Sequence, residues 1–159
     1  MDKARESTFQ NDIINEMCAH GWQLGSPKSY NRERALYEED LIAFVKNTQP
    51  KEWEKFCARY PQNSEDHFCE AVVQQLQKAD INATNEASRK FGTLGVLRHG
   101  IKTTPAHFFL CQFKPENGLN PTILANYEHN ILRIVPELVY SPHTKVDVDS
   151  LDGKTAQKW

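Results

Sequence analysis

The chain has 159 residues, of which 39% are hydrophobic and 25% are charged, and its formal net charge at pH 7 is −2. This length fits one domain with its own core, and no apolar run approaches the length that crosses a membrane. The N-terminal residues lack the apolar segment of a secretory signal. Four scattered cysteines without a CxxC pair indicate free buried thiols in a reducing cytoplasm rather than a zinc site or a disulfide framework. We therefore expect a single cytoplasmic domain over residues 1–159.

The first predicted elements are two helices. Apolar residues at spacings of three and four predict an amphipathic helix over residues 3–19, and Gly21 follows it as a stop signal. Residues 25–27 are typical of a loop. A second set of apolar residues at helical spacing predicts the next helix: Tyr37, Leu41, Phe44 and Val45.

Two more helices are predicted before residue 80. Pro50 suits the first turn of a third helix, and Pro61 would end it. Four residues form the apolar face of this helix: Trp53, Phe56, Cys57 and Tyr60. Ser64 is a candidate N-cap for a fourth helix, and residues 85–91 could form a short polar one. The inward face of the fourth helix would hold Phe68, Val72, Leu76 and Ala79.

From about residue 92 the pattern favours strands. Residues 93–98 and 107–113 are typical of two strands joined by a loop. Residues 121–127 predict one or two helical turns, and residues 131–140 predict a strand that Pro136 interrupts. Helices followed by strands predict an α+β fold.

The boundaries expected within this single domain follow from the change of pattern. A helical part covers about residues 1–91, a strand-rich part covers about residues 92–152, and a tail covers residues 153–159.

The charged residues are unevenly distributed along the chain. Residues 33–86 contain eleven acids and six bases, whereas residues 87–115 contain no acid. Five basic residues lie in this acid-free stretch: Arg89, Lys90, Arg98, Lys102 and Lys114. A local basic surface can face phosphate groups. The alternative is a chance run of bases on an exposed hairpin, or pairing of Arg98 and Lys102 with the acidic helices.

A series of short motifs extends in order along nearly the whole chain, from about residue 5 to residue 152. The motifs are Glu6-x-x-Phe9, Gly21-Trp22-Gln23-Leu24-Gly25, Ala35-Leu36-Tyr37-x-x-Asp40-Leu41-Ile42-Ala43-Phe44, Thr48-Gln49-Pro50-x-x-Trp53, Leu97-Arg98-His99-Gly100-Ile101-Lys102, Phe108-Phe109-Leu110-Cys111-Gln112-Phe113-Lys114-Pro115, Asn120-Pro121, Tyr127, Asn130, Val139-Tyr140-Ser141-Pro142 and Ser150-Leu151-Asp152. In this order the series resembles the N-terminal region of the R (restriction) subunit of type I restriction-modification enzymes.

The resemblance implies a fold and an activity. The fold would be part of a PD-(D/E)xK-type nuclease, with the helical half followed by a small sheet. The activity of the full subunit would be Mg²⁺-dependent cleavage of double-stranded DNA, coupled to an ATP-driven translocase. The partners would be double-stranded DNA and the methyltransferase and specificity subunits of the restriction complex.

The resemblance also assigns site residues. Asp152 matches the metal-binding catalytic aspartate, and Glu6 matches a glutamate of the first helix that often joins the site. The first helix would pack beside the strand that ends near Tyr140 and so bring Glu6 toward Asp152. The acid-free basic stretch, rather than the resemblance, makes Arg98, Lys102 and Lys114 candidate DNA contacts.

The nuclease motif is incomplete in the printed sequence. Phosphodiester hydrolysis needs a metal ion that holds the phosphate and activates water, and Mg²⁺ takes carboxylate ligands. The Glu-x-Lys strand that should follow Asp152 has no counterpart, so we expect these residues alone to be inactive. Asp152 could also be an ordinary solvated loop acid, and Glu6 a first-turn acid favoured by the helix dipole.

A second hypothesis treats the chain as a stand-alone, non-catalytic module. Such a module would dock on a restriction complex or bind DNA. Three departures from the family pattern weaken a DNA-cleaving function: Gln10 and Gly95 each replace an acid, and residues 136–138 replace basic residues.

Overall fold

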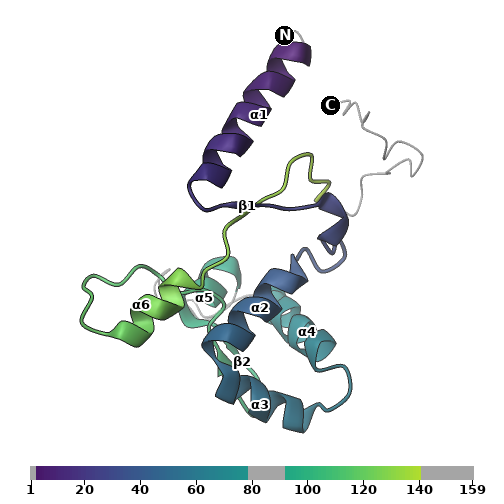
Figure 1. Cartoon of the computed structure of the whole chain (residues 1–159). Helices are drawn as coiled ribbons and strands as arrows, with labels where there is room; N and C mark the ends of the chain where they lie inside the picture. The colour runs from purple at the N-terminus through teal and green to yellow at the C-terminus, as the bar shows by residue number, and fades with distance from the viewer. Residues whose placement is uncertain (1–2, 79–91, 141–159) are drawn as a thin grey trace.

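The computed structural model describes residues 3–78 and 92–140 (Figure 1). This part of the chain contains six α-helices: α1 Lys3–Ala19, α2 Glu38–Thr48, α3 Pro50–Arg59, α4 Ser64–Gln77, α5 Gly92–His99 and α6 Pro121–Glu128. It also contains a 3₁₀ turn, η1 Pro27–Ser29, and four short strands: β1 Gln23–Leu24, β2 Ile101–Lys102, β3 His107–Phe108 and β4 Arg133–Ile134. The predicted α+β class is confirmed, while the expected helix at 85–91 lies outside the described residues.

Helices α1, α2, α3 and α6 form where the sequence predicts them. Pro50 occupies the first turn of α3, where its missing N–H costs nothing. The side chain of Asn120 caps α6 by accepting hydrogen bonds from the backbone N–H groups of Thr122 and Ile123. Such a cap satisfies donors that have no partner within the helix.

The predicted cap of α4 is wrong by one residue. Asn63 is the N-cap, in the left-handed conformation with φ 57°, and makes no side-chain capping bond. Ser64 is the first residue of α4, and its hydroxyl donates to the carbonyl of Tyr60 at 2.6 Å. The Ser64 hydroxyl therefore satisfies a carbonyl at the end of α3 rather than a donor of α4.

The hydrophobic core lies between α2, α3, α4, α5 and the β2–β3 hairpin. Its fully buried side chains come mostly from these elements: Phe56, Phe68, Phe108, Ile101, Val45, Val72, Val96 and Cys69. Phe56, Phe68 and Phe108 meet edge to face, with ring centroids 5.3 to 6.2 Å apart, a favourable geometry for aromatic rings. Trp53 packs against this cluster but remains partly exposed.

The strand predicted at residues 93–98 is wrong, because these residues form α5. Only one face of this helix is buried, through Gly95 and Val96. Arg98 and His99 occupy its last turn, where basic side chains suit the helix dipole. Gly100 ends α5 with φ 66°, a conformation that glycine adopts without a steric penalty.

The β2–β3 hairpin is shorter than predicted and begins in the segment expected to be a loop. The two strands are antiparallel, with Ile101 opposite Phe108 and Lys102 opposite His107. Of the strand predicted at residues 107–113, only His107–Phe108 pairs with another strand. Residues 109–112 are instead held by side-chain amides, as described below.

The strand predicted at residues 131–140 is confirmed only as β4. This strand pairs in parallel with β1, with Gln23 opposite Arg133 and Leu24 opposite Ile134. Because β1 has two residues, the ladder ends before Pro136.

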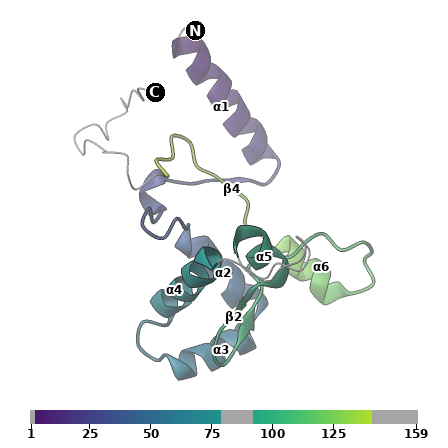
Figure 2. The ribbon, with the colours of Figure 1, turned by 180° about the vertical axis from the view of Figure 1, so that it is seen from behind.

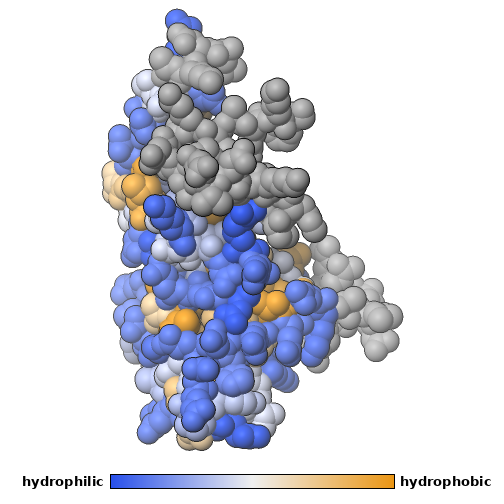
Figure 3. All heavy atoms as spheres, turned by 90° about the vertical axis from the view of Figure 1, so that its right-hand side faces the viewer, coloured by the Kyte–Doolittle hydropathy of each residue, from blue (hydrophilic) through white to orange (hydrophobic). Residues whose placement is uncertain are grey.

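The elements form a helical body and an extension (Figure 1). The body contains α2 to α5 and the hairpin, with α6 beside α5 (Figure 2). The extension contains β1, β4 and α1, which projects away from the body. Where the structure describes the face on the right-hand side of Figure 1, that face is mostly hydrophilic, with small separate hydrophobic areas (Figure 3).

Candidate functional site

Arg133 on β4 contacts side chains from β1 and from the start of α2, which both lie far from it in the sequence. Its guanidinium donates two hydrogen bonds to the Asp40 carboxylate, each 2.5 Å long, and one to Gln23 Oε1 at 3.2 Å. The guanidinium carbon also lies 4.7 Å from the centroid of the Tyr37 ring. This bidentate geometry is the strong form of an arginine–carboxylate pair, and the Asp40 contact raises the pKa of Arg133. We call Arg133, Asp40, Gln23 and Tyr37 the Arg133 hub.

A glycine makes room for the Arg133 hub. A Cβ atom at Gly25 would lie 2.5 Å from Cδ and 2.9 Å from Cγ of Arg133. Three members of the hub and Gly25 belong to the motifs that carry the sequence resemblance: Gln23, Gly25, Tyr37 and Asp40. The motif residues therefore fix the extension onto α2. Arg133 is not predicted as a site residue from the sequence, because one arginine within a predicted strand carries no signal of its partner.

Two side-chain amides act as partners for extended backbone after β3. Gln49 donates to the Phe109 carbonyl at 2.8 Å and accepts from the Phe109 N–H at 2.9 Å. Asn130 donates to the Gln112 carbonyl at 2.7 Å and accepts from the Gln112 N–H at 3.0 Å. Each side-chain amide thus makes the two hydrogen bonds that the backbone of a residue on a neighbouring strand would otherwise make. All four residues belong to the quoted motifs, and their contacts are structural.

The predicted catalytic pair is only partly described. Glu6 lies in the first turn of α1 and is exposed, while Asp152 lies outside the described residues. Helix α1 does reach the segment after β4, because Gln10 Nε2 donates to Glu137 Oε1 at 3.3 Å. Among residues 3–78 and 92–140, no three His, Cys, Asp or Glu side chains come together as a metal site.

The three predicted DNA contacts are exposed residues. Arg98 lies in the last turn of α5 and Lys102 on β2. Lys114 follows the segment that Asn130 holds. All three residues therefore lie at the surface, and Lys102 shares its face of the hairpin with His107.

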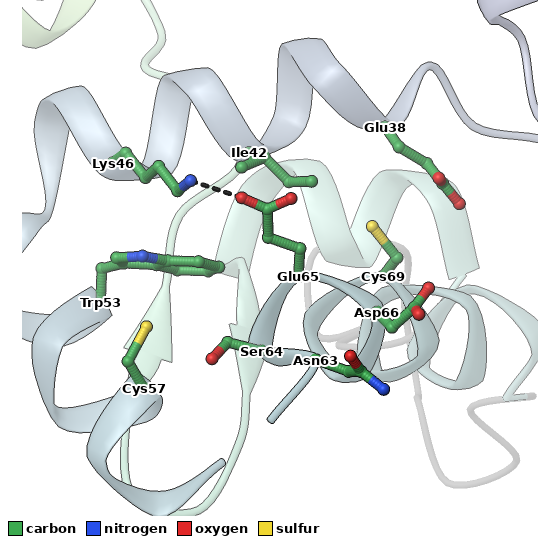
Figure 4. Close-up of a pocket in the computed structure, with 10 residues that line it drawn as sticks. All are labelled: Glu38, Ile42, Lys46, Trp53, Cys57, Asn63, Ser64, Glu65, Asp66 and Cys69. Atoms are coloured by element: carbon green, nitrogen blue, oxygen red, sulfur yellow. Dashed lines mark hydrogen bonds and ion pairs between the residues drawn. The ribbon is translucent and has the colours of Figure 1, made fainter. Parts of the chain in front are cut away.

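An open pocket of about 460 Å³ lies between α2, α3 and α4 (Figure 4). Lys46 crosses it to bind Glu65 at 2.5 Å and lies 5.4 Å from the centroid of the Trp53 ring. Arg34 binds both acids at the other end, Glu38 and Asp66, at 2.9 Å each. Each charged side chain that lines the pocket is therefore already paired, either within the lining or with Arg34, and the lining does not select a ligand.

The four cysteines are free thiols, as predicted, but only Cys69 is buried. Burial raises the pKa of Cys69 to about 11 and also raises the pKa of Cys111. A thiolate is the reactive form of cysteine. These two thiols are therefore poor candidates for a nucleophile.

Comparison with known protein families, curated proteins and solved structures found no match to this chain. None of the helices in the described ranges is long and apolar enough to cross a membrane. The function of this chain must therefore be inferred from its sequence motifs and from the contacts among their residues.

Proposed function

We propose that this chain is the N-terminal part of the R subunit of a type I restriction enzyme. The observation that supports this proposal is the Arg133 hub. Three motif residues, each more than ninety positions before Arg133 in the sequence, contact its guanidinium group. Four more motif residues are joined by the hydrogen bonds of Gln49 and Asn130. In this proposal, these contacts are the structural reason why the motif residues occur together.

In this proposal, the chain contributes a structural frame and part of a cleavage site. Asp152 and Glu6 would bind Mg²⁺ in the complete subunit, where the metal would supply phosphate binding and water activation. The described residues hold no metal-binding group, and no Glu-x-Lys pair follows Asp152 in the printed sequence. We therefore assign no cleavage to these residues alone, and ATP would act only in the full subunit.

Sequencing downstream of codon 159 tests the proposal first. A continuous or frameshifted frame that encodes a Val- and Ile-rich strand with Glu-x-Lys would support it. The polypeptide extended through that strand should then cut plasmid DNA with Mg²⁺. Glu6→Gln and Asp152→Asn should abolish cutting, whereas Asp12→Asn, a change of another exposed acid of α1, should not. Unrelated sequence after a stop codon, or equal activity of all three variants, would contradict the proposal.

A second candidate function is a stand-alone docking module. The observation that favours it is the number of exposed large apolar side chains on the extension and α6, including Phe9 (68% exposed) and Ile13 (41%) on α1. Scattered exposed apolar residues are normal, but a cluster on one element indicates a contact surface.

Docking can be tested with the methyltransferase and specificity subunits of a type I restriction complex. In size-exclusion chromatography, the chain should co-elute with their complex. The paired substitution Phe9→Ser with Ile13→Ser should abolish co-elution. Changing two exposed polar residues of the same helix, Asn11→Ser with Asn15→Ser, should leave it intact. Failure of the wild-type chain to co-elute would exclude docking on these subunits.

A further inference from the structure

The outer face of the β2–β3 hairpin carries two rings and a positive charge. Ile101 and Phe108 pair across the hairpin and point into the core, with 0% exposure each. The next pair, Lys102 and His107, must therefore face outward, since alternate strand residues point to opposite sides. The ring of Phe109 lies on that outer side as well, because its centroid is 4.8 Å from that of His107.

Both rings are held in place while they face solvent. His107 Nε2 donates to the His99 carbonyl at 2.6 Å, which fixes the imidazole orientation. Gln49 binds both backbone polar groups of Phe109, yet 47% of Phe109 is exposed. An exposed phenylalanine with a fixed backbone loses little further entropy when a second ring stacks on it.

Gly100 lets the end of α5 pack directly against the backbone of Phe108 and Phe109. A Cβ atom at this position would lie 2.0 Å from the Phe108 carbonyl oxygen and 3.1 Å from Phe109 Cα. This close backbone contact restrains Phe109 in addition to the hydrogen bonds from Gln49. We call Lys102, His107 and Phe109 the hairpin platform.

The charge around the hairpin platform favours an anionic ligand. No acid occurs between residues 87 and 115, so the local sequence offers Lys102 no carboxylate. The α4 group that contacts β2 is neutral, since Gln75 Oε1 accepts from the Lys102 N–H at 3.4 Å. A lysine next to exposed rings is the combination with which proteins bind unpaired nucleotides, the rings stacking on bases and the cation facing phosphate.

From this geometry we infer that the hairpin platform binds single-stranded nucleic acid. Phe109 stacks on an unpaired base, His107 supports the Phe109 ring from one side, and Lys102 neutralises a phosphate of the same strand. A duplex keeps its bases stacked on one another, so this ring contact discriminates in favour of single strands. The inference is independent of the cleavage site and of the motif resemblance.

Fluorescence anisotropy with the 159-residue chain tests this inference. The probes are a labelled dT₂₀ strand, the dT₂₀·dA₂₀ duplex and a U₂₀ strand, at low salt. We expect dT₂₀ to bind more tightly than the duplex, and Phe109→Ala to weaken dT₂₀ binding about 5- to 150-fold, the range of one lost base–aromatic stack. Phe9→Ala removes a more exposed phenylalanine on α1 and should leave binding unchanged. Comparison with U₂₀ shows whether the preferred strand is DNA or RNA.

Four further variants separate the effect of stacking from the effects of apolar volume and of charge. Phe109→Leu keeps apolar volume but has no aromatic face, so it should bind as weakly as Phe109→Ala, while Phe109→Trp should retain binding. Lys102→Ala should reduce the slope of log affinity against log salt by about 0.7, the value for one single-strand phosphate contact. Lys51→Ala, an exposed lysine of α3, should leave the slope unchanged.

Three results would overturn the inference. The first is equal or tighter binding of the duplex, which would indicate backbone contact without stacking. The second is full retention of dT₂₀ binding by Phe109→Leu. The third is no binding of either strand by the folded wild-type chain, which would assign the hairpin platform to a protein contact instead.

Discussion

The Arg133 hub allows a quantitative test of what holds the extension to the helical body. We expect Asp40→Ala to lower the free energy of unfolding by about 2–3 kcal/mol. Exposed ion pairs contribute up to about 1 kcal/mol, and removal of one partner from a fully buried pair costs about 3–5 kcal/mol. The side chains of Arg133 and Asp40 are 19% and 16% exposed, which places this pair between the two cases.

The hydrogen-bond geometry sets an upper limit on the expected loss of unfolding free energy. Asp40 accepts two charge-assisted hydrogen bonds from Arg133, and bonds of this kind contribute about 1.5–3 kcal/mol each. Arg133 would still contact Gln23 and Tyr37 in the variant, so part of its environment would remain. We therefore expect a loss below the sum of two bonds.

A double-mutant cycle with Asp40→Ala and Arg133→Met isolates the interaction free energy between these two side chains, which we call their coupling. Urea unfolding followed by circular dichroism gives the four free energies. The control cycle uses Glu52 and Lys55, an exposed pair on α3 with an N–O distance of 2.7 Å. Its coupling should be about 0.5 kcal/mol or less. A coupling of that size for Asp40 and Arg133 would refute our reasoning that the hub is shielded from solvent.

Three further predictions concern the body. Gly100→Ala should lower the free energy of unfolding by at least about 2 kcal/mol, because it combines a left-handed backbone with a clash at the Phe108 carbonyl; Gly118→Ala, which meets no atom within 4 Å, should be neutral, and equal melting temperatures would contradict this. Phe56→Ala should cost about 3–5 kcal/mol in urea unfolding, against about 0.5 kcal/mol or less for exposed Phe9→Ala; similar costs would show that Phe56 does not belong to the core. Burial raises the pKa of Cys69 from 9.0 to about 11, so its contribution to stability should persist below about pH 9 and decline as pH rises toward 11, and replacement by Ala should remove that decline.

Much of the helical body could be predicted from local patterns. Pro50, the apolar period of α3 and Asn120-Pro121 each mark their helix within a few residues. The strand prediction for residues 93–98 failed because a short apolar run fits either period. The sequence Arg98-His99-Gly100 is a helix-end signal, and giving it more weight would have corrected the prediction.

The contacts of the candidate site could not be predicted from local sequence patterns. Arg133 and Asp40 are 93 positions apart, and one sequence gives no sign that they meet. Gln49 and Asn130 are ordinary polar residues whose role depends on which backbone comes near them. Lys102 was predicted as a DNA contact from charge alone, whereas its position beside two rings follows only from the hairpin register.

The parallel pairing of β1 with β4 has a consequence for the order of folding. Arg133 and Gln23 are 110 positions apart, so their contact closes a loop that contains α2 to α6. Loop closure costs entropy that must be offset by the contacts it brings together. The helices of the body meet close neighbours in sequence and can assemble early, since local contacts form fastest. The extension should then dock last, onto a body that has already folded, and its contacts would stabilise that body.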